Sequence, residues 1–319
     1  MTSNLAPKVA VVGAGLIGRA WAITFARGGA NVALYDPQEG AAAAALGFVD
    51  GVLDDLAAND LLRGASPATV RGRMGVAKSL KEALAGATHV QENAPEKLDA
   101  KIPIWAEMDG LAGPDTTLAS STSAILPSKF TEKLKGRHRC VVVHPINPPY
   151  LVPAVEVVPA PWTAQATVER TARFMRELGQ SPIVMKRELD GFVMNRMQGA
   201  LLQEAFRLVA EGYASCEDID IGIRDGLGLR WAFMGPFETI DLNAPGGVSD
   251  YIARYEGIYQ RLWPSQQHIA SWADTSDRVE KELKEGLPRD KLNERQAWRD
   301  RRLMALVAHK RDASTKIKK

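Results

Sequence analysis

The chain lacks the features that mark a disulfide-built, membrane-spanning or nucleic-acid-binding protein. It has two cysteines, Cys140 and Cys216, which form neither a disulfide framework nor a metal-ligand spacing, so we expect reduced thiols and a cytoplasmic location. No apolar run approaches the roughly 20 residues that a membrane-spanning helix needs. The 40 basic and 38 acidic residues give a formal charge of +2, which offers no argument for nucleic acid or an anionic membrane as a partner.

What the chain does have is a repeated alternation of β-rich runs and helical segments over its N-terminal part. A β-rich run at residues 8–12 precedes a glycine turn, a helix-like segment at 19–27 and a second β-rich run at 32–35. The further expected strands are 89–91, 117–120, 140–144, 154–158 and 182–185, and the further expected helices are 41–59, 102–111 and 163–178. This alternation predicts an α/β Rossmann domain with a doubly wound, largely parallel sheet over residues 1–188.

The pattern changes near residues 187–190. From Gly191 onward the periodicity is helical and strand-like runs are absent. The expected helices here are 192–211, 217–225, 237–242, 248–262 and 289–310. We therefore expect an all-α domain over residues 189–319.

Residues 13–18 have the spacing G-x-G-x-x-G, and Asp36 follows 36 − 18 = 18 residues later at the end of the second expected strand. In a strand–turn–helix setting such glycines let the backbone approach a pyrophosphate at the helix N-terminus. The acidic residue binds the ribose hydroxyls and repels a 2′-phosphate, which favours NAD over NADP. The alternative is a structural turn without a ligand. The predicted NAD contacts here are Gly13, Gly15, Leu16, Ile17, Gly18 and Asp36.

A histidine and a glutamate lie on neighbouring expected strands. His144 ends its strand, which is where ligands bind in an open α/β sheet, and Glu156 lies on the next strand. A carboxylate bonded to one ring nitrogen fixes the tautomer and favours the charged imidazole, as a general acid/base requires. From these residues alone, a hydrogen-bonded turn histidine with no catalytic role is an equal alternative.

Taken together, residues 120–123, 144–149, 156 and 191–196 resemble the 3-hydroxyacyl-CoA dehydrogenase superfamily, and the resemblance runs through essentially the whole chain. It implies that His144 is the base and that Glu156 is its paired carboxylate. It also implies that Ser123 and Asn195 contact the substrate oxygen.

The same resemblance extends to the cofactor and to the assembly. It implies that Glu96, Lys101 and Asn147 lie at the nicotinamide end of NAD. It also implies that residues 189–319 contribute to substrate binding and to the contacts of a homodimer. Within the superfamily, residues 120–123, 144–150 and 226–243 are most similar to the λ-crystallin type, the L-gulonate 3-dehydrogenases.

The sequence departs from the acyl-CoA enzymes in two places. In that family basic residues on a helix after the second strand bind CoA, whereas residues 41–56 here carry no cation. The segment 226–236 is longer than its acyl-CoA counterpart and carries Arg230 and Trp231, which suit a small carboxylate and a hydrophobic wall. A surface or interface ion pair is the alternative for Arg230.

We therefore expect NAD-dependent oxidation of the 3-hydroxyl of a small free hydroxy acid, with L-gulonate converted to 3-dehydro-L-gulonate. The alternatives are a carnitine 3-dehydrogenase, a 3-hydroxybutyryl-CoA dehydrogenase and, from another class, a crystallin-like structural protein. No metal is expected.

Overall fold

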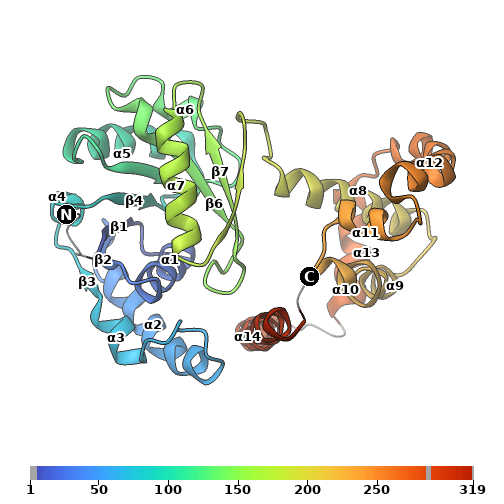
Figure 1. Cartoon of the computed structure of the whole chain (residues 1–319), viewed down its shortest axis with the longest axis horizontal. Helices are drawn as coiled ribbons and strands as arrows, with labels where there is room; N and C mark the ends of the chain where they lie inside the picture. The colour runs from blue at the N-terminus through green and yellow to red at the C-terminus, as the bar shows by residue number, and fades with distance from the viewer. Residues whose placement is uncertain (1–5, 285–288, 318–319) are drawn as a thin grey trace. The chain divides into compact units, whose positions relative to one another are not determined.

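In the computed structural model, residues 6–284 and 289–317 are described, and the chain divides into two compact units (Figure 1). One unit is Met1–Asn195 with Asp300–Lys319, and the other is Arg196–Arg299. The last helix, α14 (Leu292–Lys316), therefore lies mostly in the first unit, whereas we expected it in the helical domain. It groups there because Met304 is buried in the core of that unit, and Arg301 pairs with Asp55.

The first unit contains an eight-stranded sheet with the strand order β3-β2-β1-β4-β5-β6-β7-β8. Neighbouring strands are parallel except for β6 and β7, which are antiparallel. The strands are β1 (Lys8–Val12), β2 (Asn31–Tyr35), β3 (Met74–Val76), β4 (His89–Glu92), β5 (Thr117–Ser120), β6 (Cys140–Pro145), β7 (Ala154–Pro159) and β8 (Ser181–Val184). The predicted doubly wound, largely parallel sheet is confirmed.

Helices cover both faces of this sheet because its central strands are apolar on both sides. In β1, Val9 and Val11 join one core cluster, whereas Ala10 and Val12 join a second cluster on the opposite face. The first cluster takes residues from α1 (Leu16–Arg27), α2 (Ala41–Ala58), α3 (Pro67–Gly72) and α7 (Gln165–Glu177). The second takes residues from α4 (Leu80–Leu84), α5 (Leu98–Leu111) and α6 (Ser128–Thr131).

In the second unit, all regular elements of the described residues are helical, as predicted. They are α8 (Met194–Ala210, which begins in the first unit), α9 (Cys216–Ile221), a π-helix (Gly222–Leu227), α10 (Gly228–Trp231), α11 (Pro236–Leu242), α12 (Gly247–Gln266) and α13 (Trp272–Lys284), with a 3-10 turn at Arg289–Lys291. Where we expected one helix at 217–225, the chain instead forms α9, the π-helix and α10 in succession. Glycines at 222, 226 and 228 weaken the α-helical preference there.

The elements that the sequence analysis missed are mostly short. β3 has three residues and α6 has four, which is too few for a hydrophobic period to show. The longer α13 was also missed, because its sequence is rich in charged residues and offers few apolar positions.

Within the described ranges, no helix combines the length and apolarity needed to cross a membrane.

Candidate functional site

The predicted site residues of the first unit gather at one edge of the sheet. The parallel strands β1, β4, β5 and β6 all end there, and this carboxyl edge is where open α/β sheets bind ligands. The glycine turn follows β1, Asp36 follows β2, Ser123 follows β5, and His144 lies near the end of β6. One topological feature therefore brings the predicted cofactor and catalytic residues to the same edge.

The three glycines of the turn have different structural roles. Gly13 has a φ of +91°, and a Cβ there would lie 2.8 Å from the carbonyl oxygen of Asn93. A Cβ on Gly18 would collide with the carbonyl oxygen of Gly13, so α1 packs against the turn only with glycine there. A Cβ on Gly15 would meet nothing within 4 Å. The fold explains the first two glycines, whereas open space at Gly15 fits the close approach of a dinucleotide pyrophosphate to the N-terminus of α1.

Asp36 lies beside this turn. Its Oδ2 accepts a hydrogen bond of 2.7 Å from the backbone N–H of Ala14, and its Oδ1 accepts one of 2.9 Å from Gln38 N–H. The carboxylate is thus fixed at the end of β2 by the turn itself, in the position that the dinucleotide fingerprint requires for ribose binding. In the first turn of α1, Leu16 is exposed and Ile17 is half-buried.

His144 and Glu156 face each other across the antiparallel pair β6–β7, in direct register. Nδ1 of His144 lies 2.7 Å from Oε2 of Glu156, and the two side chains are 8% and 0% exposed. A carboxylate can only accept this hydrogen bond, so Nδ1 carries the proton. In the neutral ring Nε2 is then the basic nitrogen, as a general base requires.

The other oxygen of Glu156 is bound by the backbone before α8. Oε1 accepts hydrogen bonds of 2.7 and 2.9 Å from the N–H groups of Val193 and Met194. Gly191 and Phe192 precede them with φ values of +76° and +50°. For Phe192 this left-handed backbone is strained by about 1–3 kcal/mol, a cost that tertiary contacts must offset. The turn thereby aims two amides at the carboxylate, a role that the sequence analysis did not foresee.

These contacts decide the charge of Glu156. Burial alone would raise the pKa of this carboxyl, but the hydrogen bond from His144 and those from Met194 and Val193 outweigh it, so the pKa lies below its usual value. The fully buried ring of Phe192 lies 5.6 Å from that of His144 and packs beside the pair. Glu156 is therefore an ionised, fixed partner for the histidine near neutral pH.

Ser123 and Asn195 are also brought together. Asn195 Nδ2 donates a hydrogen bond of 2.6 Å to the backbone carbonyl of Ser123, whose side chain is exposed. Glu96 Oε1 accepts hydrogen bonds of 3.0 Å from the N–H groups of Ser123 and Ala124, and it also bonds the Thr122 hydroxyl. Glu96 thus holds the turn that carries Ser123.

Lys101 is almost fully enclosed. Its side chain is 1% exposed, and Nζ lies 2.9 Å from Oε1 of Glu92, which is fully buried. Glu92 was missed by the sequence analysis, although a glutamate that ends a short strand is a signal at the carboxyl edge of a sheet. Asn147 is half-buried just after β6. The roles of Lys101 and Asn147 toward NAD stay predictions.

Arg230 and Trp231 belong to the second unit, at the end of α10. Both are exposed, Trp231 by 40%. Their role in carboxylate binding stays a prediction.

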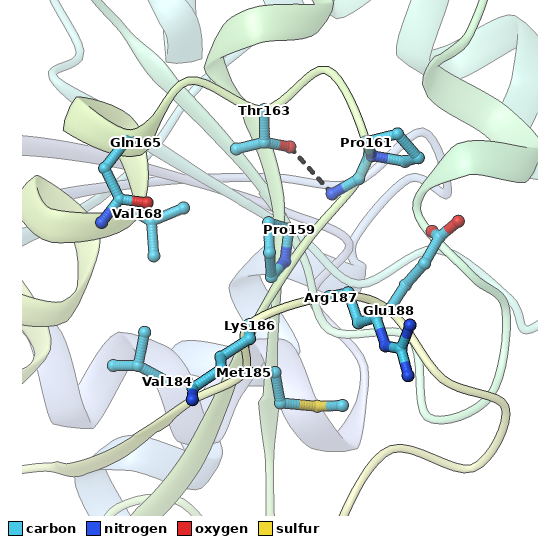
Figure 2. A pocket seen from close by; sticks show the side chains of 11 residues that line it. Pro159, Pro161, Thr163, Gln165, Val168, Val184, Met185, Lys186, Arg187 and Glu188 are labelled. Carbon is cyan, nitrogen blue, oxygen red and sulfur yellow. Dashed lines mark hydrogen bonds between the residues drawn. The ribbon is translucent and has the colours of Figure 1, made fainter.

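The first unit has a cavity of about 360 Å³ that is lined by none of the predicted site residues, and Figure 2 shows its lining side chains. Pro159 at the end of β7, Val184 at the end of β8 and Gln165 at the start of α7 are among its lining. Because β7 runs antiparallel to β6, its end lies beside Val141 at the start of β6. The cavity is therefore at the opposite edge of the sheet from His144.

Two family models together match most of the chain. Residues 8–188 match the family described as 3-hydroxyacyl-CoA dehydrogenase, NAD binding domain, and residues 191–283 match 3-hydroxyacyl-CoA dehydrogenase, C-terminal domain. The chain is 41% identical to lambda-crystallin of Oryctolagus cuniculus over 98% of each chain. It is 39% identical to L-carnitine dehydrogenase of Nocardiopsis dassonvillei, covering 96% of this chain and 92% of the other.

A solved structure is similar over nearly the whole chain. The NAD+-dependent dismutase 5-formyl-3-hydroxy-2-methylpyridine 4-carboxylic acid 5-dehydrogenase superposes with a TM-score of 0.80 at 28% identity, over 96% of this chain and 98% of the other.

Replacing Gly15 by alanine tests the cofactor turn. We predict that Gly15→Ala weakens NAD+ binding about tenfold or more, because the added methyl group occupies the approach of the pyrophosphate. The melting temperature should change little, since the methyl group meets nothing within 4 Å. Calorimetric titration with NAD+ measures the first effect and thermal unfolding the second. The control is Gly47→Ala on the exposed face of α2. Parent-like NAD+ affinity in Gly15→Ala would show that the turn does not bind the cofactor.

Asp36→Ala tests the cofactor preference. We predict that the parent has a higher kcat/KM with NAD+ than with NADP+, and that the substitution lowers this ratio because the carboxylate no longer repels a 2′-phosphate. Initial rates with both cofactors measure it. An unchanged ratio would contradict the assignment of Asp36.

Proposed function

We propose that this chain, which belongs to the NAD-dependent 3-hydroxyacyl-CoA dehydrogenase family, oxidises the 3-hydroxyl of a small free hydroxy acid. L-Gulonate is the proposed substrate and 3-dehydro-L-gulonate the product. The observation that carries the choice of a free acid is the sequence of α2, which has no basic residue where CoA-binding cations are expected.

The proposed proton transfer depends on the hydrogen-bonded pair of His144 and Glu156. NAD+ supplies the hydride acceptor when it is bound along the glycine turn. Nε2 of His144 takes the proton of the substrate hydroxyl as general base. Glu156 stabilises the imidazolium that forms, because its ionised carboxylate stays bonded to Nδ1. Ser123 and Asn195 hold the substrate oxygen.

The charges on α2 argue against a CoA thioester. The helix carries carboxylates at Asp50, Asp54 and Asp55 and no basic residue. Two arginines near it are engaged, since Arg71 pairs with Asp50 at 2.8 Å and Arg301 with Asp55 at 3.3 Å. The phosphates of CoA need several cations, whereas one carboxylate needs one bidentate partner.

We propose Arg230 as the partner of the substrate carboxylate, with Trp231 beside it. A guanidinium offers two parallel donors that match a carboxylate. The second candidate substrate is carnitine, because the chain resembles an L-carnitine dehydrogenase over most of its length and an indole face such as that of Trp231 binds quaternary ammonium groups. A purely structural role, as the name lambda-crystallin suggests, is disfavoured by the complete set of His144, Glu156 and their partners.

We also propose that the chain is a cytoplasmic homodimer. The second unit exposes large apolar side chains that a solvated surface does not require, and a second copy would cover them. Among them are Phe233, Phe237, Leu229 and Leu242, each more than 60% exposed.

His144→Gln tests the mechanism. We predict a loss in kcat of about 100-fold or more, since a positioned general base contributes about 10²–10⁴-fold. NAD+ affinity should change little, because the ring acts on the substrate hydroxyl. Steady-state kinetics and NAD+ titration measure the two effects, with the exposed His138→Gln as control. Near-parent turnover would remove His144 from the mechanism.

Arg230→Met tests the substrate class. We predict that L-gulonate and 3-hydroxybutyrate are oxidised by the parent and that 3-hydroxybutyryl-CoA is a poor substrate. The substitution should raise KM for the acids, with a loss of about 2–5 kcal/mol if the ion pair becomes buried on binding. NADH formation with each substrate measures both effects, and Arg224→Met on the adjacent π-helix is the control. Efficient turnover of the CoA thioester would contradict the proposed substrate class, and an unchanged KM in Arg230→Met would contradict the role proposed for Arg230.

A further inference from the structure

The mechanism above makes no use of Glu92, although its carboxylate is fully buried at the carboxyl edge of the sheet. Oε1 accepts hydrogen bonds of 2.5 Å from Ala94 N–H and 2.9 Å from Lys101 Nζ. Oε2 accepts bonds of 2.6 Å from the Ser120 hydroxyl and 3.0 Å from Trp105 Nε1. One carboxylate therefore ties together the loop after β4, the helix α5 and the end of β5.

A first chain of contacts leads from this carboxylate to the turn that carries Ser123. Ser120 donates its hydroxyl proton to Glu92 and accepts a hydrogen bond of 3.2 Å from Thr122 N–H. The backbone adds a parallel link, because Ser121 N–H donates to the carbonyl of Glu92 at 2.8 Å. The residues just before Ser123 are thus fixed to Glu92 through both side chain and main chain.

A second chain of contacts, made of ion pairs, also connects Glu92 to this turn. Lys101 Nζ lies 2.9 Å from Glu92 and 3.9 Å from Oε2 of Glu96. Glu96 is 43% exposed, and its other oxygen bonds the N–H groups of Ser123 and Ala124. The buried ammonium therefore lies between a fully buried carboxylate and the carboxylate that holds the turn.

We propose that Glu92 is a positioning residue for the substrate oxygen, acting through Ser120, Lys101 and Glu96 on the turn at residues 122–124. The proposal rests on the role proposed for Ser123. A buried ammonium needs a counter-charge. The carboxylate of Glu92 supplies that counter-charge to Lys101 inside the fold, so Glu96 stays bonded to the backbone of the turn. Without that charge, Glu96 is the remaining partner, and Lys101 draws it inward, away from the N–H groups of Ser123 and Ala124.

The test combines an exchange measurement with kinetics on the full chain. The variants are Glu92→Gln and Ser120→Ala, and the control is Thr171→Ala, which removes a buried hydroxyl that bonds only within α7. Hydrogen exchange followed by mass spectrometry reports on the peptide that contains residues 121–125. We expect faster exchange there in both variants, with kcat for the hydroxy acid lower by about 10–100-fold, because small misplacements of a binding group have effects of that size. In Ser120→Ala, which keeps the Glu92–Lys101 ion pair, the Kd for NAD+ should stay within about threefold of the parent value, a change of about 0.7 kcal/mol.

A double variant separates positioning from simple loss of stability. Glu92→Gln leaves a buried ammonium without its main partner, and Glu92→Gln with Lys101→Met removes both charges. Positioning predicts that the double variant regains melting temperature but only part of the exchange protection of residues 121–125. Glu96 is then no longer drawn away from the turn, whereas the Ser120 hydroxyl has still lost its carboxylate partner. A merely structural role predicts that melting temperature and exchange protection return together in full, and this result would overturn the proposal, as would parent-like exchange and kcat in Ser120→Ala.

The hydrogen-exchange measurement does not depend on which substrate the protein uses. If the parent oxidises no hydroxy acid, the proposed function fails, while the exchange of residues 121–125 in Ser120→Ala still decides whether Glu92 holds the turn.

Discussion

The contact between His144 and Glu156 is the interaction on which the site depends. It requires that β6 and β7 pair antiparallel in the observed register, because a slip by one residue would turn one of the two side chains to the opposite face of the sheet. It also requires donors for the second carboxylate oxygen, since a buried charge with unused acceptors is costly. The left-handed turn at Gly191 and Phe192 supplies them as the amides of Val193 and Met194.

Two buried carboxylates organise this edge of the sheet in similar ways. Glu156 and Glu92 each lie on a strand, each accepts at least one hydrogen bond from the backbone, and each bonds a nitrogen that carries or acquires positive charge. They differ in that nitrogen. An imidazole such as that of His144 offers a ring nitrogen that can accept a proton, which suits proton transfer, whereas an ammonium such as that of Lys101 offers only donors and suits a fixed support.

Much of this arrangement was predictable from the sequence. The glycine spacing with Asp36, and a histidine and a glutamate on neighbouring β-rich runs, predicted the sheet edge and its residues, because those patterns reflect local backbone geometry. The contacts of Glu92 were not predictable, since they join β4, α5 and β5 through tertiary packing. The strained turn at Phe192 was also hidden, because no local pattern marks a left-handed phenylalanine. The place of α14 beside the first unit depends on long-range contacts such as that of Arg301 with Asp55.

The pH dependence of kcat/KM in the parent and in Glu156→Gln tests the account most directly. The glutamine removes the negative charge that favours the imidazolium, and its single amide oxygen can accept either from Nδ1 or from the N–H groups of Val193 and Met194. The account predicts a moderate loss of activity, smaller than that of His144→Gln, and an acid limb of the profile displaced to lower pH, because the base then loses its proton more easily. A profile that keeps its acid limb in place after the substitution would contradict the central claim that Glu156 is the charged partner of the catalytic histidine.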